Sequence, residues 1–154
     1  MILHSFVLNI CFPYTSTNEI SEACKSALKY SKETSNPLPI FDNSSLFDCF
    51  LDTWDSPPLE ILVRTSGESR LSEFLMWQVC RKNRETGRLV QIHILDALWP
   101  EFGFKHLVPI ILRYQSTKTK DTKTEDLLLD RDIEELKEWR RVNKLEYLQQ
   151  IVNQ

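Results

Sequence analysis

The sequence has little that would mark a membrane, nucleic-acid or metal-binding protein. In its 154 residues no apolar run reaches the length of about 18 residues that a membrane-spanning helix needs. Neither sign of charge predominates, because 19 lysines and arginines stand against 22 aspartates and glutamates. A basic nucleic-acid footprint is therefore not expected. The three histidines, His4, His93 and His106, lack the i, i+4 spacing of a helical metal site, so we expect them to be structural or exposed.

Cysteine is present but without a recognisable framework. Cys11, Cys24, Cys49 and Cys80 form no Cys-x-x-Cys pair, so a zinc site is not indicated. The apolar residues 1–12 lack a preceding basic region, so they resemble a strand more than a signal peptide. Without an export signal a disulfide framework is not expected. We predict four small buried thiols in a reducing compartment.

Strand and helix patterns alternate over the first 115 residues. Nearly continuous apolar runs at 6–12 and 60–64 predict strands buried on both faces, and residues 90–95 predict a third strand. Helices are predicted from Ser16 onward, over 46–52, over 71–80 and over 104–114. In the last of these, Pro109 would either kink the interior of the helix or mark a later start. Ser16 and Glu19 have the spacing of a capping box. This alternation predicts an α/β fold in which part of a parallel sheet is flanked by helices.

The end of the chain has a different composition. Residues 116–129 are polar and predict a linker, and residues 130–154 predict a C-terminal helix with acidic residues at its start and basic residues after them. Apolar residues recur there at every third position, which drifts by about 60° per step around an α-helix. A coiled-coil seam is therefore not expected. We predict that this helix packs on its own domain or on a partner.

The segment 64–72 carries the strongest chemical signal. Arg64 closes a predicted strand, Gly67 permits a turn, and Arg70 and Ser72 are predicted to open the next helix. Ligands of open α/β sheets bind at the carboxyl ends of strands, and two guanidinium groups with a hydroxyl there could clamp a diphosphate. In the alternative interpretation Arg64 pairs with Glu68, and Ser72 only caps the helix. The residues themselves leave both interpretations open.

Three segments of the chain resemble the cis-prenyltransferases, the undecaprenyl diphosphate synthase family. Residues 62–78, from Leu-Val-Arg-Thr-Ser-Gly-Glu-Ser-Arg to Met-Trp-Gln, resemble its diphosphate-binding signature. Residues 98–102, Leu-Trp-Pro-Glu-Phe, and the upstream residues 8–20 are similar to two further segments in family order. The resemblance is nearest to the catalytic subunits of eukaryotic dehydrodolichyl diphosphate synthases. It implies that residues 1–115 are the C-terminal half of a cis-prenyltransferase domain.

The resemblance also implies a reaction. Isopentenyl diphosphate units would be added in cis to an allylic primer, which the family resemblance implies is farnesyl diphosphate. The product would be dehydrodolichyl or polyprenyl diphosphate for dolichol and protein glycosylation. Arg64, Arg70 and Ser72 would hold the diphosphate of isopentenyl diphosphate, and Mg²⁺ would assist the departure of the allylic diphosphate. By their spacing, Phe74, Leu75 and Trp77 are expected in the core and not in a substrate tunnel.

The sequence departs from the family pattern in three ways. The Asp motif of the family's N-terminal half, which binds Mg²⁺ and the allylic diphosphate, has no counterpart, so this chain alone is expected to be inactive. Thr17 stands where an arginine is usual. An insertion over 81–88 is inferred, and the metal-associated glutamate of bacterial members then falls on Asn83; nearby Glu85 is not assigned that role. No metal ligand is therefore predicted in this chain.

Partners and location follow only from the resemblance. It implies a heterodimer with an inactive subunit of the Nogo-B receptor type, or a homodimer. It also implies peripheral association with the cytosolic face of the endoplasmic reticulum or with a lipid droplet. The alternatives are a truncated non-catalytic fragment, a dimerising regulatory piece, or an inactive partner-type subunit, although such subunits usually end in an Arg-x-Gly tail that residues 151–154 lack.

Overall fold

A computed structural model describes residues 8–35, 38–83, 87–117 and 127–152. The chain begins with α1 (Ser16–Glu33), α2 (Ser44–Asp48) and the 3₁₀ turn η1 (Asp52–Asp55). These are followed by β1 (Ile61–Arg64), α3 (Met76–Cys80), β2 (Gln91–Ile94) and η2 (Trp99–Glu101). Two longer helices, α4 (Phe104–Ser116) and α5 (Leu127–Val152), complete the order. The predicted α/β class is confirmed.

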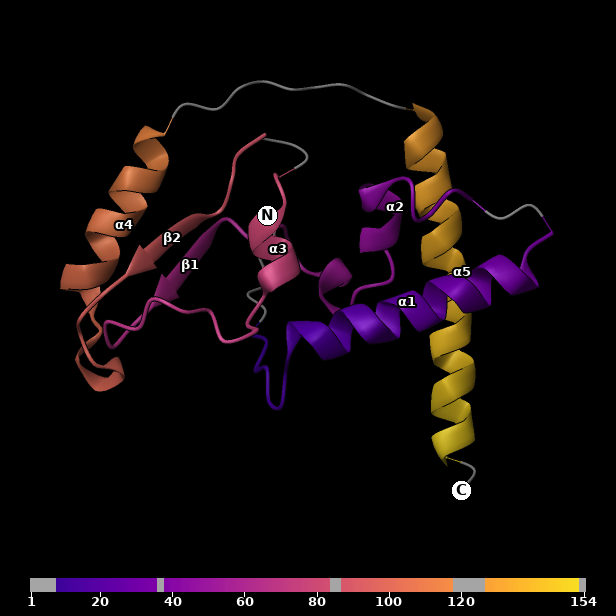
Figure 1. Cartoon of the computed structure of the whole chain (residues 1–154), viewed down its shortest axis with the longest axis horizontal. Helices are drawn as coiled ribbons and strands as arrows, with labels where there is room; N and C mark the ends of the chain where they lie inside the picture. The colour runs from indigo at the N-terminus through magenta and orange to yellow at the C-terminus, as the bar shows by residue number, and fades with distance from the viewer. Residues whose placement is uncertain (1–7, 36–37, 84–86, 118–126, 153–154) are drawn as a thin grey trace, which may run out of the picture.

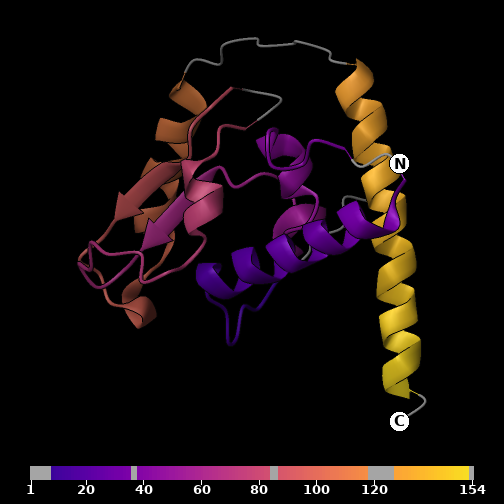
Figure 2. The ribbon, with the colours of Figure 1, turned by 45° about the vertical axis from the view of Figure 1, so that its right-hand side comes forward.

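β1 and β2 form a parallel two-stranded sheet. Ile61 pairs with Gln91, and Arg64 pairs with Ile94, so the two strands end in register. The strands lie between α4 and α3 in Figure 1, and α4 lies behind them in Figure 2. The carboxyl ends of β1 and β2 therefore meet at one edge of the sheet, where the two following loops lie side by side.

The predicted strand over residues 6–12 is not formed in its described part. Residues 6–7 lie outside the described residues, and residues 8–12 pair with neither β1 nor β2. Leu8, Ile10 and Phe12 are 85%, 82% and 91% exposed. Apolar composition predicts burial, but a buried parallel strand also requires a neighbouring strand on each side to pair its backbone groups.

The hydrophobic core lies between α1, α2, the turn after α2 and α5. Ala27, Leu46 and Leu136 are almost fully buried there, and the Trp139 ring packs edge-on against Tyr30 at 5.4 Å between centroids. Full burial of such a leucine contributes about 1.5–3 kcal/mol. The Tyr30 hydroxyl also donates to Glu135 at 2.8 Å. The C-terminal helix therefore packs on its own domain, which was one of the two predicted arrangements.

The predicted ends of the later helices are close to those observed. α5 begins at Leu127, three residues before the predicted start, and residues 118–126 of the predicted linker lie outside the described residues. α4 includes Pro109 in its interior, which was one of the two predicted possibilities. No helix in the described part of the chain has the length and apolar character needed to cross a membrane.

The prediction of four buried thiols is wrong for two of them. Cys49 is buried in the core and Cys24 is partly buried, but Cys11 and Cys80 are exposed. Cys11 lies on the unpaired segment before α1, and Cys80 is the last residue of α3. Burial raises the pKa of the Cys49 thiol to about 12, which keeps this thiol protonated and unreactive.

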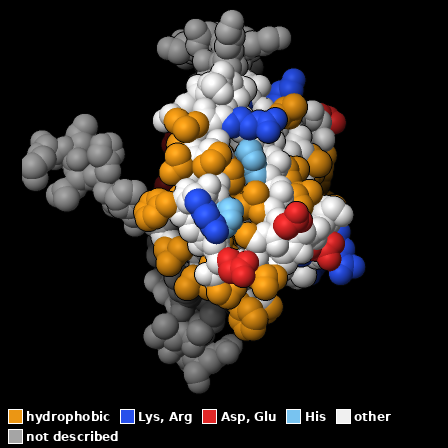
Figure 3. Space-filling view, turned by 90° about the vertical axis from the view of Figure 1, so that its left-hand side faces the viewer, with side chains coloured by type: hydrophobic (Ala, Val, Ile, Leu, Met, Phe, Trp, Pro, Cys, Tyr) orange, Lys and Arg blue, Asp and Glu red, His pale blue; other side chains and the backbone are white. Residues whose placement is uncertain are grey.

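Apolar side chains remain exposed on β2 and α4. Ile92 and Ile94 of β2 are 45% and 48% exposed, and Phe104 at the start of α4 is 83% exposed. Figure 3 looks from this side of the molecule and shows apolar side chains between separate charged ones. Several exposed apolar side chains on one face of a folded domain are typical of a surface that binds another molecule.

Candidate functional site

The loops that follow β1 and β2 are joined at the carboxyl edge of the sheet. The backbone N–H of Ser66 donates to the carbonyl of Ala97 at 2.9 Å, and that of Gly67 donates to Leu95 at 2.8 Å. Gly67 has a φ of +64°, and a Cβ at this position would lie 3.0 Å from Oδ1 of Asp96. Glycine is therefore required for both its conformation and its close approach. The edge is held in the position where α/β sheets bind ligands.

Arg64 is the last residue of β1 and lines a small hollow beside this edge. The hollow has a volume of about 200 Å³ and is lined by Leu62, Val63, Arg64, Leu71 and Phe74. The Nε atom of Arg64 is shielded from solvent and has no hydrogen-bond partner among the described residues. Leaving such a donor unsatisfied costs free energy. Arg64 therefore brings a positive charge to the wall of the hollow, where an anion would be attracted.

Arg70 lies on the surface and contacts Glu68. Its Nε is 3.1 Å from Oε2 of Glu68, and its side chain is 77% exposed. Such an exposed pair contributes only about 0–1 kcal/mol, so the guanidinium group can turn to a ligand at little cost. The alternative interpretation, in which Arg64 pairs with Glu68, is not supported, because Glu68 contacts Arg70.

The helix predicted over 71–80 begins only at Met76. Ser72, Glu73 and Leu75 have φ values of 48°, 62° and 50°, in the left-handed region. The prediction that Arg70 and Ser72 open a helix is therefore wrong, because their segment is irregular. Helix propensity and apolar spacing failed here because contacts with α1 determine the local backbone.

Ser16 makes those contacts at the first turn of α1. Its backbone N–H donates to the carbonyl of Glu73 at 2.8 Å, and its hydroxyl accepts from the N–H of Met76 at 2.8 Å. The N-cap of α1 is Thr15, whose hydroxyl accepts from Asn18, and not Ser16 as the capping-box pattern predicted. The Ser16 hydroxyl is thus free to cap the start of α3.

Glu19 is a buried carboxylate that joins four parts of the chain. It is only 3% exposed and accepts hydrogen bonds from the Tyr14 hydroxyl at 2.6 Å, the Gln78 amide at 2.9 Å and both the N–H and hydroxyl of Thr53. Burial alone would raise the pKa of Glu19, but these hydrogen bonds outweigh it and lower the pKa. Burial and the bond to Glu19 raise the pKa of Tyr14 to about 12. The only sequence signal for this role is the i, i+4 spacing that places Glu19, Ala23 and Ala27 on one helix face.

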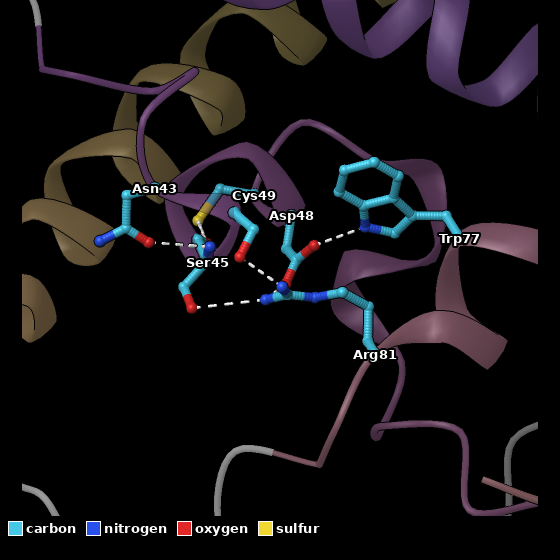
Figure 4. A network of polar contacts seen from close by, with 7 residues as sticks. Asn43, Ser45, Asp48, Cys49, Trp77 and Arg81 are labelled. Atoms are coloured by element: carbon cyan, nitrogen blue, oxygen red, sulfur yellow. Dashed lines mark hydrogen bonds and ion pairs between the residues drawn. The ribbon is translucent and has the colours of Figure 1, made fainter. Parts of the chain in front are cut away.

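A second polar network joins α3 to α2 (Figure 4). The Trp77 indole donates to Oδ1 of Asp48 at 2.7 Å, and Arg81 donates to Oδ2 of Asp48 at 2.8 Å. Trp77 also packs against the core, as predicted. Phe74 does not: it is 38% exposed, lines the hollow and meets the Tyr14 ring edge-on at 5.7 Å.

No cluster of metal-binding side chains lies at this edge in the described part of the chain. Among the residues that the structure describes, no three histidine, cysteine, aspartate or glutamate side chains come together. Asn83 donates to Glu60 at 3.0 Å, and Glu85 lies outside the described residues. His106 accepts from the N–H of Gly103 and stacks on Phe102, which confirms a structural role for it. No chemical step through a metal ion is therefore assigned to these residues.

Comparisons with known proteins agree on one family. The family described as putative undecaprenyl diphosphate synthase matches residues 3–121. A dehydrodolichyl diphosphate synthase complex subunit of Schizosaccharomyces pombe is 40% identical over 109 residues, which are 70% of this chain and 38% of that protein. A subunit of the same description from Homo sapiens is 38% identical over 120 residues, 78% of this chain and 33% of that protein.

A bacterial relative gives the same result. The ditrans,polycis-undecaprenyl-diphosphate synthase ((2E,6E)-farnesyl-diphosphate specific) of Haemophilus influenzae is 35% identical over 112 residues, 72% of this chain and 43% of that protein. The chain thus spans about two fifths of the length of the curated relatives it matches, or less.

Proposed function

Because the chain belongs to the undecaprenyl diphosphate synthase family of cis-prenyltransferases, we propose that it binds isopentenyl diphosphate for transfer to an allylic prenyl diphosphate. The observation that carries this proposal is the shielded Nε of Arg64, a donor without a partner among the described residues, in a hollow at the carboxyl edge of the sheet. The product would be a polyprenyl or dehydrodolichyl diphosphate.

The three predicted residues have distinct parts in this proposal. Arg64 would grip two diphosphate oxygens from within the hollow, because a guanidinium group presents a planar fork of donors. Arg70 would leave Glu68 to neutralise charge from the surface side, and the exposed Ser72 hydroxyl would donate one further hydrogen bond. Leu71 and Phe74, which line the same hollow, would contact the short apolar chain of the substrate.

Holding this substrate is the chain's contribution to the reaction. The double bond of isopentenyl diphosphate attacks C1 of the allylic substrate, whose bond to the diphosphate oxygen breaks and leaves its electron pair on that group. A proton is then lost from C2 of the isopentenyl unit. A fixed diphosphate keeps the attacking double bond in reach, which lowers the entropic part of the barrier. Glu19 is no candidate base, because four hydrogen bonds occupy its carboxylate.

The wider setting is proposed on the relatives. We propose farnesyl diphosphate as the primer, because the name of the bacterial relative specifies it. The names of the yeast and human relatives specify a complex, so we propose that the exposed apolar side chains of β2 and α4 meet a second subunit, such as one of the Nogo-B receptor type. Mg²⁺ and the cytosolic face of the endoplasmic reticulum are proposed on the family resemblance alone.

A second candidate is a non-catalytic subunit that retains the substrate site. The observation that favours it is the lack of a metal-binding cluster within the described residues, since departure of a diphosphate requires cations. In that case the chain would bind isopentenyl diphosphate without turning it over.

Calorimetric titration of the full chain with isopentenyl diphosphate tests both candidates. We expect binding at one site, competition by inorganic diphosphate, and no binding of isopentenol, which lacks the charged group. Chain elongation would then be measured with farnesyl diphosphate and Mg²⁺. Turnover supports the first candidate, binding without turnover supports the second, and absence of binding refutes the site.

A further inference from the structure

The segment between Arg70 and α3 has a backbone that its residue types do not favour. Ser72, Glu73 and Leu75 all have φ between +48° and +62°. This left-handed region is sparsely populated by residues other than glycine, and such residues persist there only when the surrounding structure holds them. The same segment includes Leu71 and Phe74, which line the hollow, and Ser72, whose hydroxyl is proposed to bind the diphosphate. What holds this backbone therefore determines the shape of the site.

Two hydrogen bonds with Ser16 hold the segment, one at Glu73 and one at Met76. The Ser16 N–H reaches the carbonyl of Glu73, and the Ser16 hydroxyl receives the N–H of Met76. Met76 is the first residue of α3, so its N–H has no acceptor within that helix. Ser16 is only 2% exposed. One side chain and its own backbone therefore fix the three strained residues from outside.

Glu19, which lies three residues after Ser16 on α1, also binds α3. Its carboxylate accepts from Gln78 on α3 at 2.9 Å, and the Gln78 amide also reaches the Thr53 hydroxyl at 2.6 Å. The Tyr14 hydroxyl donates to the same Glu19 oxygen, Oε2, and the Tyr14 ring packs against Phe74 of the hollow. These contacts fix both the start of α3 and one wall of the hollow.

We propose that Ser16 and Glu19 are positioning residues for isopentenyl diphosphate. The Ser16–Glu19 clasp, as we name these two residues, holds residues 72–76 in the conformation that presents Ser72, Leu71 and Phe74 to the ligand. Neither residue touches the ligand itself. This inference rests on the proposed function.

The clasp is separate from the contacts that stabilise the core. The core consists of apolar side chains of α1, α2 and α5, and the hydroxyl of Ser16 is directed to Met76. Removing that hydroxyl leaves the packing of Leu136 and its neighbours intact. Loss of the clasp should therefore reduce affinity for the ligand by more than its effect on thermal stability would explain.

The test compares Ser16→Ala with Ser21→Ala, a matched change at an exposed position of the same helix. Each variant of the full chain is titrated with isopentenyl diphosphate, and amide hydrogen exchange is measured over residues 72–78. We expect Ser16→Ala to raise Kd about fivefold and to speed exchange in this segment. Ser21→Ala should leave both within about twofold of the unchanged chain. Glu19→Gln, with Glu22→Gln as its exposed control, should repeat the pattern.

A third variant separates positioning from stability. Leu136→Ala removes a core side chain far from the clasp and should lower Tm more than Ser16→Ala, yet leave Kd close to that of the unchanged chain while the protein is folded. Equal Kd values for Ser16→Ala and the unchanged chain would overturn the role of the clasp but not the proposed function. A loss of affinity in Leu136→Ala equal to that in Ser16→Ala would do the same. If the unchanged chain fails to bind isopentenyl diphosphate, the proposed function fails, and the clasp loses its ligand role with it.

Discussion

Replacing Arg64 with lysine separates the charge of this side chain from the shape of its guanidinium group. Both groups are cationic, but lysine is a point charge that cannot present two parallel donors to a diphosphate. A charge-assisted hydrogen bond contributes about 1.5–3 kcal/mol. Loss of one arm of the fork should therefore raise the Kd for isopentenyl diphosphate at least about tenfold, since 1.4 kcal/mol corresponds to a factor of about ten.

The same change should leave stability nearly untouched. The Nε of Arg64 has no hydrogen-bond partner among the described residues, so its removal breaks no bond that this atom makes within the fold. We expect Tm to shift by less than about 3 °C, which is under about 1 kcal/mol for a domain of this size. Titration calorimetry and thermal unfolding of the same preparations measure both quantities.

A surface arginine supplies the control for this prediction. Arg141 on α5 makes a two-pronged contact with Glu138, with distances of 2.9 and 2.7 Å, on an exposed face. Arg141→Lys therefore removes a fork at a position remote from the hollow and should leave Kd unchanged. Unchanged affinity in Arg64→Lys would refute the clamp. A large fall in its Tm would instead show that Arg64 serves the fold.

Three further changes test other parts of the site. Arg70→Ala should raise the Kd for isopentenyl diphosphate at least about tenfold with little change in Tm, because the pair of the exposed Arg70 with Glu68 contributes only about 0–1 kcal/mol. Gly67→Ala should lower stability by about 1 kcal/mol or more, measured by denaturant unfolding, because the site has a φ of +64° and the new Cβ meets Asp96 at 3.0 Å. Stability should also fall in acid, because the pKa of Glu19 is lower in the folded chain than in the unfolded chain. The contribution of the Glu19 carboxylate to stability is complete above the ordinary pKa of about 4.3, and it is lost as the pH falls through the folded value. Glu19→Gln should flatten this part of the Tm profile, and an unchanged profile would contradict the assignment.

The parts of the fold that follow from local pattern were predicted well. β1, β2, α1 and α4 appear near their predicted positions, because each carries an apolar run or a helical pattern that its own residues determine. α5 also does, and its prediction came from acidic residues at its start followed by basic ones. The strand predicted over 6–12 does not form in its described residues. Its apolar residues meet the requirement for burial, but pairing depends on neighbouring strands, which no local pattern records.

The candidate site was predicted in its location but not in its local structure. The position of Arg64 at the end of a strand, and of Gly67 in the turn after it, follows from the sequence. The irregular backbone over 72–75 does not, because it depends on Ser16, which lies more than fifty residues earlier. The capping-box pattern gave Ser16 and Glu19 a local role in α1, and their actual partners are set by the packing of α1 against α3.

α3 is the joint between the core and the sheet that carries the site. The helices α1, α2 and α5 lie on one side of it and the sheet with α4 lies on the other (Figure 1). Three side chains of α1 and α2 accept hydrogen bonds from successive residues of α3: Ser16 from Met76, Asp48 from Trp77 and Glu19 from Gln78. Hydrogen bonds weaken steeply when their angles change, whereas apolar contacts tolerate sliding and rotation. Bonds to successive residues therefore fix the rotation of a helix that is too short to be stable alone. Through that rotation, they also fix the segment that connects it to the carboxyl edge of the sheet.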